Sequence, residues 1–375
     1  MTRPGHGHPT STPAGASRPA EPSPPPLRLL VEQGIRDVSG QILLRSRLHT
    51  AARRLGFDAQ TRDYMEMVCS EITTNQIKYA EGTGLFQIWE SRLGPPALEL
   101  FGLDHGPGIG NIARARRDGV SSAGTLGRGL GSIGRLGHQW DLYTLPRTAQ
   151  SPSTWHGLAV WVRFYLDGAE RASGSWEKGG FLRAYQDLSA MGDWLGCSET
   201  GPRLRWLHLD GLGHGLKAAE AIAEHEGTLE SKAPLERALE SLDARLRGGR
   251  GAVALLGEAD LHRGEVSLCG VGDLVVYVIQ GERRQELSFP PGILGHAHRR
   301  IQTEAAPLNP DTLVLSASDG VRTNWDLSTF PGLWHLHPQL IALFLGHNAG
   351  RTTDDRSLFA VRPVRDTHGR KGARP

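Results

Sequence analysis

The chain is poor in cysteine, and no two of its cysteines lie near each other. Only Cys69, Cys197 and Cys269 occur in 375 residues, and there is no CxxC pair. The spacing therefore suggests neither a zinc site nor a disulfide framework. Because free thiols persist in a reducing compartment, we expect a cytoplasmic protein.

Long apolar runs and a charge excess of one sign are also missing. No apolar stretch approaches the ~20 residues that a membrane helix needs. The N-terminal arginine has no apolar segment behind it, so we expect neither a membrane span nor a secretory signal. Lys and Arg number 42 against 40 Asp and Glu, a net charge of +2. This balance provides no broad basic field for nucleic acid.

What the chain does have is length and apolar content. Its 375 residues, 38% of them hydrophobic, suffice for two domains with separate cores. We expect a disordered Pro-rich arm over 1–26, a first domain over 27–166 and a Gly-rich linker over 167–180. A second domain over 181–363 and a loose basic tail over 364–375 complete the chain.

Apolar spacing predicts helices and strands in both halves. In the first half we expect helices over 36–55 and 60–80, and strands over 86–89, 97–103, 138–144 and 158–166. In the second half we expect helices over 216–226 and 235–246, and strands over 204–209, 252–257, 265–269, 274–279, 312–317 and 358–361. The predicted fold class is α+β, with helices on one face of a mixed sheet, followed by a β-sandwich flanked by helices.

A polar stripe lies on the helix expected over 60–80. At helical spacing, Glu71 and Asn75 share a face with Tyr64 and Val68. Unpaired burial of a carboxylate and an amide is costly. A magnesium phosphate group would satisfy both, with Asn75 as a ligand of the ion and Glu71 as the acceptor of a nucleophile's proton. The alternative is a helix whose polar edge simply faces water.

Two glycine-rich stretches follow this helix. Asp104 comes directly after a strand and begins DHGPGIG, where the carboxylate can accept from an exocyclic amine and the glycines let the backbone approach a ligand. Further on, GTLGRGLG leads into a helix start, whose N–H groups attract phosphate. Either stretch alone is also compatible with a simple turn or linker.

The order of these three pieces resembles the GHKL ATPase fold, and within it the serine kinases of bacterial partner-switching modules. SEITTNQIKYA looks like the N-box of that family, DHGPGI like its adenine box and SSAGTLGRGLGSIGRL like its lid. The resemblance implies a site for ATP with Mg²⁺, with Glu71 as general base, Asn75 as magnesium ligand and Asp104 as acceptor of the adenine amine. It also implies glycines that line the nucleotide: Gly106, Gly108, Gly127, Gly129 and Gly131. Leu158 departs from the family, which often has threonine there.

Four aspartate sites lie at expected strand edges in the second half: Asp193, Asp210, Asp319 and the pair Asp354-Asp355. Converging carboxylates repel each other unless cations lie between them. Oxygen ligands of this kind favour Mg²⁺ or Mn²⁺, and two such ions can activate water for attack on a phosphomonoester. The alternative, that Asp-Gly marks hairpin turns, fits Asp210 poorly, because Gly-His-Gly and a helix follow it.

The motifs around these aspartates resemble metal-dependent protein phosphatases of the SpoIIE (PPM) type over about residues 181 to 362. They are LHLDGLGHGLKAAEA, PPGILGHAHRR, LVLSASDGVRTNWDL and DDRSLFAV. The resemblance implies two Mg²⁺ or Mn²⁺ ions, with Asp210 as a catalytic residue. The implied metal ligands are Asp193, Asp210, the backbone carbonyl of Gly211, Asp319 and Asp354, with Asp355 as second choice.

Other residues near these motifs have open roles. Asp273 stands where the family commonly has asparagine, and it adds negative charge near the site. His214 either assists proton transfer or acts as a hydrogen-bonding spacer. The candidates for a phosphate clamp are Arg205, Arg299 and Arg300.

Together the two halves predict a bifunctional regulator of a partner-switching pathway that controls a sigma factor. The first domain would use ATP and Mg²⁺ to phosphorylate serine or threonine on a STAS-type antagonist. The second would hydrolyse phosphoserine or phosphothreonine. In the alternative, the first domain is an ATP-dependent binding module for a sigma factor or antagonist, and only the phosphatase turns over. A sensor histidine kinase is disfavoured, because no dimerisation helix with a phosphoacceptor histidine precedes the ATP site.

Overall fold

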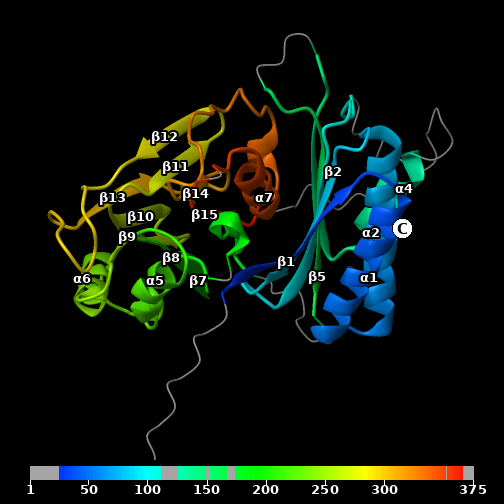
Figure 1. Ribbon diagram of the computed structural model, residues 1–375. Coiled ribbons are helices and arrows are strands. Elements are labelled where there is room, and N and C mark those ends of the chain that lie inside the picture. Colours follow the sequence, from blue (N-terminus) through cyan, green and yellow to red (C-terminus); the bar gives the residue numbers. More distant parts are fainter. Residues whose placement is uncertain are drawn as a thin grey trace, which may run out of the picture.

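The computed structural model describes residues 25–110, 126–148, 153–166, 174–188, 190–351 and 353–365. Within these ranges the chain forms three five-stranded sheets with helices packed on them (Figure 1). The α+β class predicted from the sequence is confirmed. Among the described residues, no helix is long and apolar enough to cross a membrane.

The first sheet has the strand order β1-β2-β3-β5-β4. Its strands are β1 (Leu27–Ile35), β2 (Gly84–Ser91), β3 (Ala97–Leu103), β4 (Gln139–Leu145) and β5 (Gly157–Tyr165). The sequence predicts a mixed sheet, but every pairing is antiparallel. The β2–β3 connection is a short hairpin, which only an antiparallel pair permits. Strand β1 is not among the predicted strands, and it adds an edge next to β2.

Three helices cover one face of this sheet: α1 (Val38–Arg54), α2 (Ala59–Tyr79) and α4 (Leu126–Leu136). The first two begin at Val38 and Ala59, within two residues of the predicted starts at 36 and 60, and an aspartate caps each of them. Asp37 accepts from the N–H of Gly40 at 3.0 Å, and Asp58 accepts from the N–H of Thr61 at 2.8 Å. Their apolar sides form one core with the sheet.

The other two sheets stack into a β-sandwich, with orders β13-β10-β9-β8-β7 and β12-β11-β14-β15-β6. Apolar residues from both sheets fill the space between them. The first of these sheets has β7 (Asp193–Thr200), β8 (Arg203–Gly211), β9 (Ala252–Asp260), β10 (Glu265–Val271) and β13 (Gln302–Pro307). The second has β6 (Trp176–Arg183), β11 (Val275–Gln280), β12 (Arg283–Leu287), β14 (Leu313–Ala317) and β15 (Arg356–Pro363).

Helices lie on both outer faces of the sandwich. Helix α6 (Leu235–Leu246) packs on the β8–β9–β10 side, as its leucine stripe predicts. The short helix α5 (Leu216–Ala221) follows β8. Helix α7 (Pro338–Asn348), which the sequence analysis does not predict, covers the β6–β15 side.

Helix α7 also contacts the first sheet, so it lies between the two halves of the chain (Figure 1). All its residues from Pro338 to Gly346 are buried. The ring of Phe344 lies 5.1 Å from Tyr143 and 4.7 Å from Trp155, both from the first half. The first sheet therefore buries one face under α1 and α2 and the other against α7.

The segment predicted as a linker, 167–180, contains the first residues of strand β6. Its glycines allow close packing: a Cβ on Gly179 would lie 2.3 Å from the backbone nitrogen of Gln339, at the start of α7. A Cβ on Gly180 would lie 2.4 Å from Leu27. These glycines suggest a flexible linker in the sequence, but in the structure they let β6 pack closely against α7 and β1.

Replacement of Phe344 by alanine tests this packing. Because the ring is fully buried, we expect Phe344→Ala to lower the free energy of unfolding by about 3–5 kcal/mol. Val38→Ala, at a residue 58% exposed on α1, is the control and should change it by less than about 0.5 kcal/mol. Urea denaturation followed by tryptophan fluorescence measures both. A loss below about 1 kcal/mol for Phe344→Ala would contradict the packing.

Candidate metal centre and nucleotide site

The predicted aspartates gather at one end of the sandwich. Asp193 and Asp210 face each other in the register of β7 and β8. Asp319 follows β14 and Asp354 precedes β15, and these two strands pair with each other. The strand ends of both sheets therefore meet at the place where the sequence predicts converging carboxylates.

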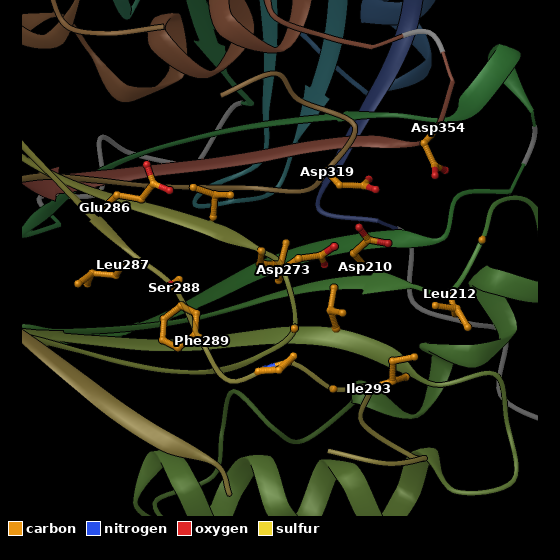
Figure 2. A pocket seen from close by; sticks show the side chains of 17 residues that line it. Asp210, Leu212, Asp273, Glu286, Leu287, Ser288, Phe289, Ile293, Asp319 and Asp354 are labelled. Atoms are coloured by element: carbon orange, nitrogen blue, oxygen red, sulfur yellow. The ribbon is translucent and has the colours of Figure 1, made fainter. Parts of the chain in front are cut away.

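A cavity of about 600 Å³ opens at this end of the sandwich. Asp210, Asp273, Asp319 and Asp354 line it, and Figure 2 shows their carboxylates around one common space. Apolar residues form a wall beside the carboxylates: Leu287 at the end of β12, Phe289, Pro291 and Ile293 on the loop after it, and Leu212 after β8. No lysine or arginine is among the described residues that line the cavity.

Without a positive charge near them, these carboxylates repel one another and are costly to bury. Burial raises the pKa of Asp210 well above its ordinary value, and the neighbouring Asp193, Asp319 and Asp354 raise it further. The pKa of Asp319 is raised by burial and by Asp354 and Asp273. Positive charge placed in the cavity would relieve both effects.

The charged side chains that line the described cavity are all carboxylates, and oxygen ligands of this kind fit a hard divalent cation. As they stand, the described His, Cys, Asp and Glu side chains form no group of three or more that could hold a metal ion. The carboxylates thus share a cavity without forming a closed coordination shell.

The adjacent residues Asp354 and Asp355 have different roles. Asp354 lines the cavity. Asp355 turns away and accepts from the N–H groups of Tyr185 and Gly192, each at 2.6 Å, and so holds the loop that leads to Asp193. Asp354, and not Asp355, therefore faces the cavity. Gly320 must be glycine here, because a Cβ would lie 1.8 Å from the carbonyl oxygen of Asp355.

The arginines considered as a phosphate clamp do not line the cavity. Arg205 donates to Glu258 at 2.6 Å and to the carbonyl oxygens of Ser231 and Ala233, so it has a structural role and the prediction for it is wrong. Arg299 and Arg300 are exposed outside the cavity lining. The exposed His214 also lies outside it, with its ring 4.7 Å from Tyr185.

A buried polar network behind Asp193 was not predicted. The ring of His208 contacts Ser316 Oγ through Nδ1 at 2.8 Å and Ser357 Oγ through Nε2 at 2.7 Å. Ser357 donates to Asp193 Oδ2 at 2.5 Å. The nearby Ser318 hydroxyl, like that of Ser357, acts to lower the pKa of Asp193, against the larger effect of burial. The sequence carries only a weak signal for it, a histidine and serines within apolar strands.

Part of the predicted nucleotide site also comes together. Asn75 and Asp104 line one small cavity with Ile72, Gly102 and Leu158. Asp104 Oδ1 accepts from the N–H groups of Gly106 at 2.9 Å and Leu158 at 3.1 Å. Glu71 is half-buried one helical turn before Asn75, but it does not line this cavity.

The glycines of this region differ from one another. Gly108 has a φ of +72°, and a Cβ there would lie 2.7 Å from the carbonyl oxygen of Leu145, which explains the requirement for glycine. Gly127, Gly129 and Gly131 lie inside helix α4 and not in a loop. The fully buried Ile133 anchors this helix against the sheet. The preceding part of the predicted lid, 121–125, lies outside the described residues.

Two residues near Asp104 were not predicted. Gln76 donates to the carbonyl oxygens of Leu85 and Leu103, while its own Oε1 is buried without a hydrogen-bond partner among the described residues. Thr144 pairs with Leu158 in the β4–β5 register and donates to the carbonyl oxygen of Gly157 at 2.9 Å. A hydroxyl is therefore present beside Leu158 although that residue lacks one.

Comparison with known proteins gives matches to both halves. The sequence model described as Stage II sporulation protein E (SpoIIE) matches residues 200–363. The serine/threonine-protein kinase RsbT of Bacillus subtilis (strain 168) is 34% identical over 92 residues, which are 24% of this chain and 68% of RsbT.

Solved structures also resemble the chain. A chain reported with the bacterial stressosome shares 26% identity, with 50% of this chain and 99% of that one covered and a TM-score of 0.45. RsbX in complex with magnesium shares 18% identity, with 50% and 95% covered and a TM-score of 0.44.

The sequence matches define a class: this is a regulator of the partner-switching type, built from a kinase-like and a phosphatase-like part. Through its N-terminal region the chain belongs to the family of the serine/threonine-protein kinase RsbT, and it carries a SpoIIE-type phosphatase domain. The fusion predicted from the motifs is confirmed.

Removal of one carboxylate should relieve the repulsion in the cavity. We expect Asp210→Asn, in protein treated with a chelator, to raise the free energy of unfolding by about 1–3 kcal/mol, because the folded state no longer has to hold a carboxylate whose pKa burial and neighbouring aspartates raise. Asp260→Asn is the control, for which we expect a lower free energy of unfolding. Asp260 forms an ion pair with Arg203 at 2.7 Å, and the substitution removes that pair. Thermal denaturation with chelator measures both. A less stable Asp210→Asn protein would contradict the repulsion.

Proposed function

We propose that this chain is a bifunctional switch regulator, with a GHKL-type kinase domain that phosphorylates a STAS-type protein and a phosphatase domain that removes phosphate from serine or threonine. The observation that carries the proposal is the acidic cavity, where carboxylates from both sheets of the sandwich meet without a lysine or arginine among the described lining residues. It lies within the part of the chain that matches SpoIIE.

In this proposal the kinase domain spans about 27–166 and the phosphatase domain about 181–363. Strand β6 pairs with β15 along its whole length, and this pairing supports a start of the proposed phosphatase domain near Trp176. The arm over 1–26 and the tail over 364–375 stay expectations from the sequence, since most of their residues lie outside the described ranges.

The phosphatase residues would hold two Mg²⁺ or Mn²⁺ ions: Asp193, Asp210, the carbonyl of Gly211, Asp319 and Asp354. Bound divalent cations supply Lewis acidity and a nucleophile at neutral pH. Asp210, which lies near the other carboxylates, would be both a ligand and the catalytic residue of this set. Because no arginine or lysine lines the described cavity, the negative charge of the phosphate would have to be balanced by those cations.

The apolar wall of the cavity indicates what lies beside the phosphate. Leu212 is 48% exposed at the mouth and Ile293 lines the same side, so an apolar side chain of a protein substrate can pack there. A small phosphate ester lacks the neighbouring side chains that a protein substrate would place there.

A substitution at the wall should therefore separate protein substrates from small ones. We expect Leu212→Ala to reduce kcat/KM for a phosphorylated protein by about 3- to 10-fold, the effect of a few lost methylenes, and to leave hydrolysis of p-nitrophenyl phosphate unchanged. Leu43→Ala, at a residue 45% exposed on α1, is the matched control. Equal losses on both substrates would argue against a binding role for the wall.

In the kinase domain, Asp104 would accept from the adenine amine. Its Oδ1 is held by two backbone N–H groups, and no described residue donates to Oδ2, which leaves this oxygen for a ligand. Asn75 in the same cavity would bind Mg²⁺, and Glu71 would accept the proton of the substrate hydroxyl. Gly106 and Gly108 would line the nucleotide, together with Gly127, Gly129 and Gly131 at α4.

A second candidate is an ATP-dependent binding module for a sigma factor or antagonist, with only the phosphatase turning over. The position of Glu71 favours this reading, because it does not share the cavity of Asn75 and Asp104. In both cases ATP binds; only phosphoryl transfer distinguishes them.

The experiment is a time course with labelled ATP, Mn²⁺ and a purified STAS-domain protein. We expect label to appear on the partner and then decay with the wild-type chain, and to persist with Asp210→Asn. Glu71→Ala should abolish labelling without loss of partner binding. If Asp210→Asn never labels the partner, the first domain is a binding module; if wild-type protein leaves a prephosphorylated partner intact, the phosphatase proposal is wrong.

A further inference from the structure

His208 lies in the interior of the sandwich on β8, two residues before Asp210. Along β8, Leu207 and Leu209 face helix α6, while Leu204 and Trp206 face the opposite sheet. His208 is on the second side and is fully buried. Its side chain reaches the facing sheet, where it contacts Ser316 on β14 and Ser357 on β15.

The protons of this network have one consistent arrangement. An ionised Asp193 can only accept, so the hydroxyl of Ser357 donates its single proton to Asp193. Ser357 Oγ must then accept from His208 Nε2–H. A neutral ring has one N–H, so Nδ1 accepts from the hydroxyl of Ser316.

A second hydroxyl completes the surroundings of Asp193. Ser318 accepts from the backbone N–H of Ser357 at 3.0 Å, and its hydroxyl is near enough to the Asp193 carboxylate to act on its pKa. His208 and the three serines are each at most 1% exposed. Burial of so many polar groups costs stability unless each is paired, and an apolar side chain at 208 would fill the core between the sheets more simply. The network therefore points to a role at Asp193.

We propose that His208 is a positioning residue for the metal site: its Nε2–H orients the Ser357 hydroxyl, which holds the Asp193 carboxylate in the direction that a divalent cation requires. The inference rests on the proposed metal-dependent phosphatase. Groups that orient metal ligands in this way typically change metal affinity by 10- to 100-fold.

The test is titration of the full chain with Mn²⁺ alone, by calorimetry and by electron paramagnetic resonance. We expect His208→Leu to weaken Mn²⁺ binding at least about 10-fold. His208→Gln, which keeps an N–H donor toward Ser357, should recover part of the loss. Ser357→Ala should weaken binding as His208→Leu does, and the double variant should lose little more, because both changes break the same connection.

A matched control separates this role from general destabilisation. Gln339 is also fully buried and bonds to both backbone groups of Gly180, at 3.0 and 2.9 Å, on the far side of β6. Gln339→Leu should lower the melting temperature and leave Mn²⁺ affinity unchanged. If folded His208→Leu binds Mn²⁺ as tightly as wild type, the inference is wrong.

The wild-type protein gives an independent reading should the variants not fold. Nitrogen-15 NMR of the His208 ring should show a protonated Nε2 and an unprotonated Nδ1. A protonated Nδ1 would overturn the proposed direction of the network. Failure of wild-type protein to bind Mn²⁺ at all would instead overturn the metal-dependent phosphatase itself.

Discussion

The burial of helix α7 on two sides is the constraint that joins the halves of this chain. One side of the helix covers β6 and β15, and the other places Phe344 against Tyr143 and Trp155 of the first sheet. Exposure of either side would leave a large apolar surface in water. Polar contacts accompany the packing: Arg183 on β6 forms a pair with Glu32 on β1 at 2.5 Å. The kinase-like and phosphatase-like parts therefore share a core.

A second constraint acts at the end of the sandwich. Strand pairing brings the carboxylates of Asp193, Asp210, Asp319 and Asp354 together from both sheets, and burial strengthens their repulsion. The rest of the fold holds this unfavourable arrangement in place through Asp355, which bonds to the loop before β7. An arrangement that opposes folding and is nevertheless built from four separate segments indicates a ligand that compensates it.

Residue patterns within single segments predicted much of this structure. They could not predict contacts between segments that are far apart in the sequence. The helices that Asp37 and Asp58 cap begin within two residues of their predicted starts, Asp210 lies near the end of β8, and Asp319 follows β14 as expected. Helix α7 has no amphipathic period, because neither of its sides meets water. Gly179 and Gly180 suggest a linker until the approach of α7 and Leu27 is known. The partners of Arg205 and His208 likewise come from strands and loops far away in sequence, so their roles required the fold.

The central claim is that the acidic cavity is a divalent metal centre, and crystals grown with Mn²⁺ test it most directly by anomalous diffraction at the manganese edge. The account predicts anomalous peaks in the cavity, bound by Asp210 together with Asp193, Asp319 or Asp354, with Asp355 still bonded to the backbone of Tyr185 and Gly192. Saturating Mn²⁺ with no peak in the cavity, or with peaks only at sites elsewhere, would contradict it.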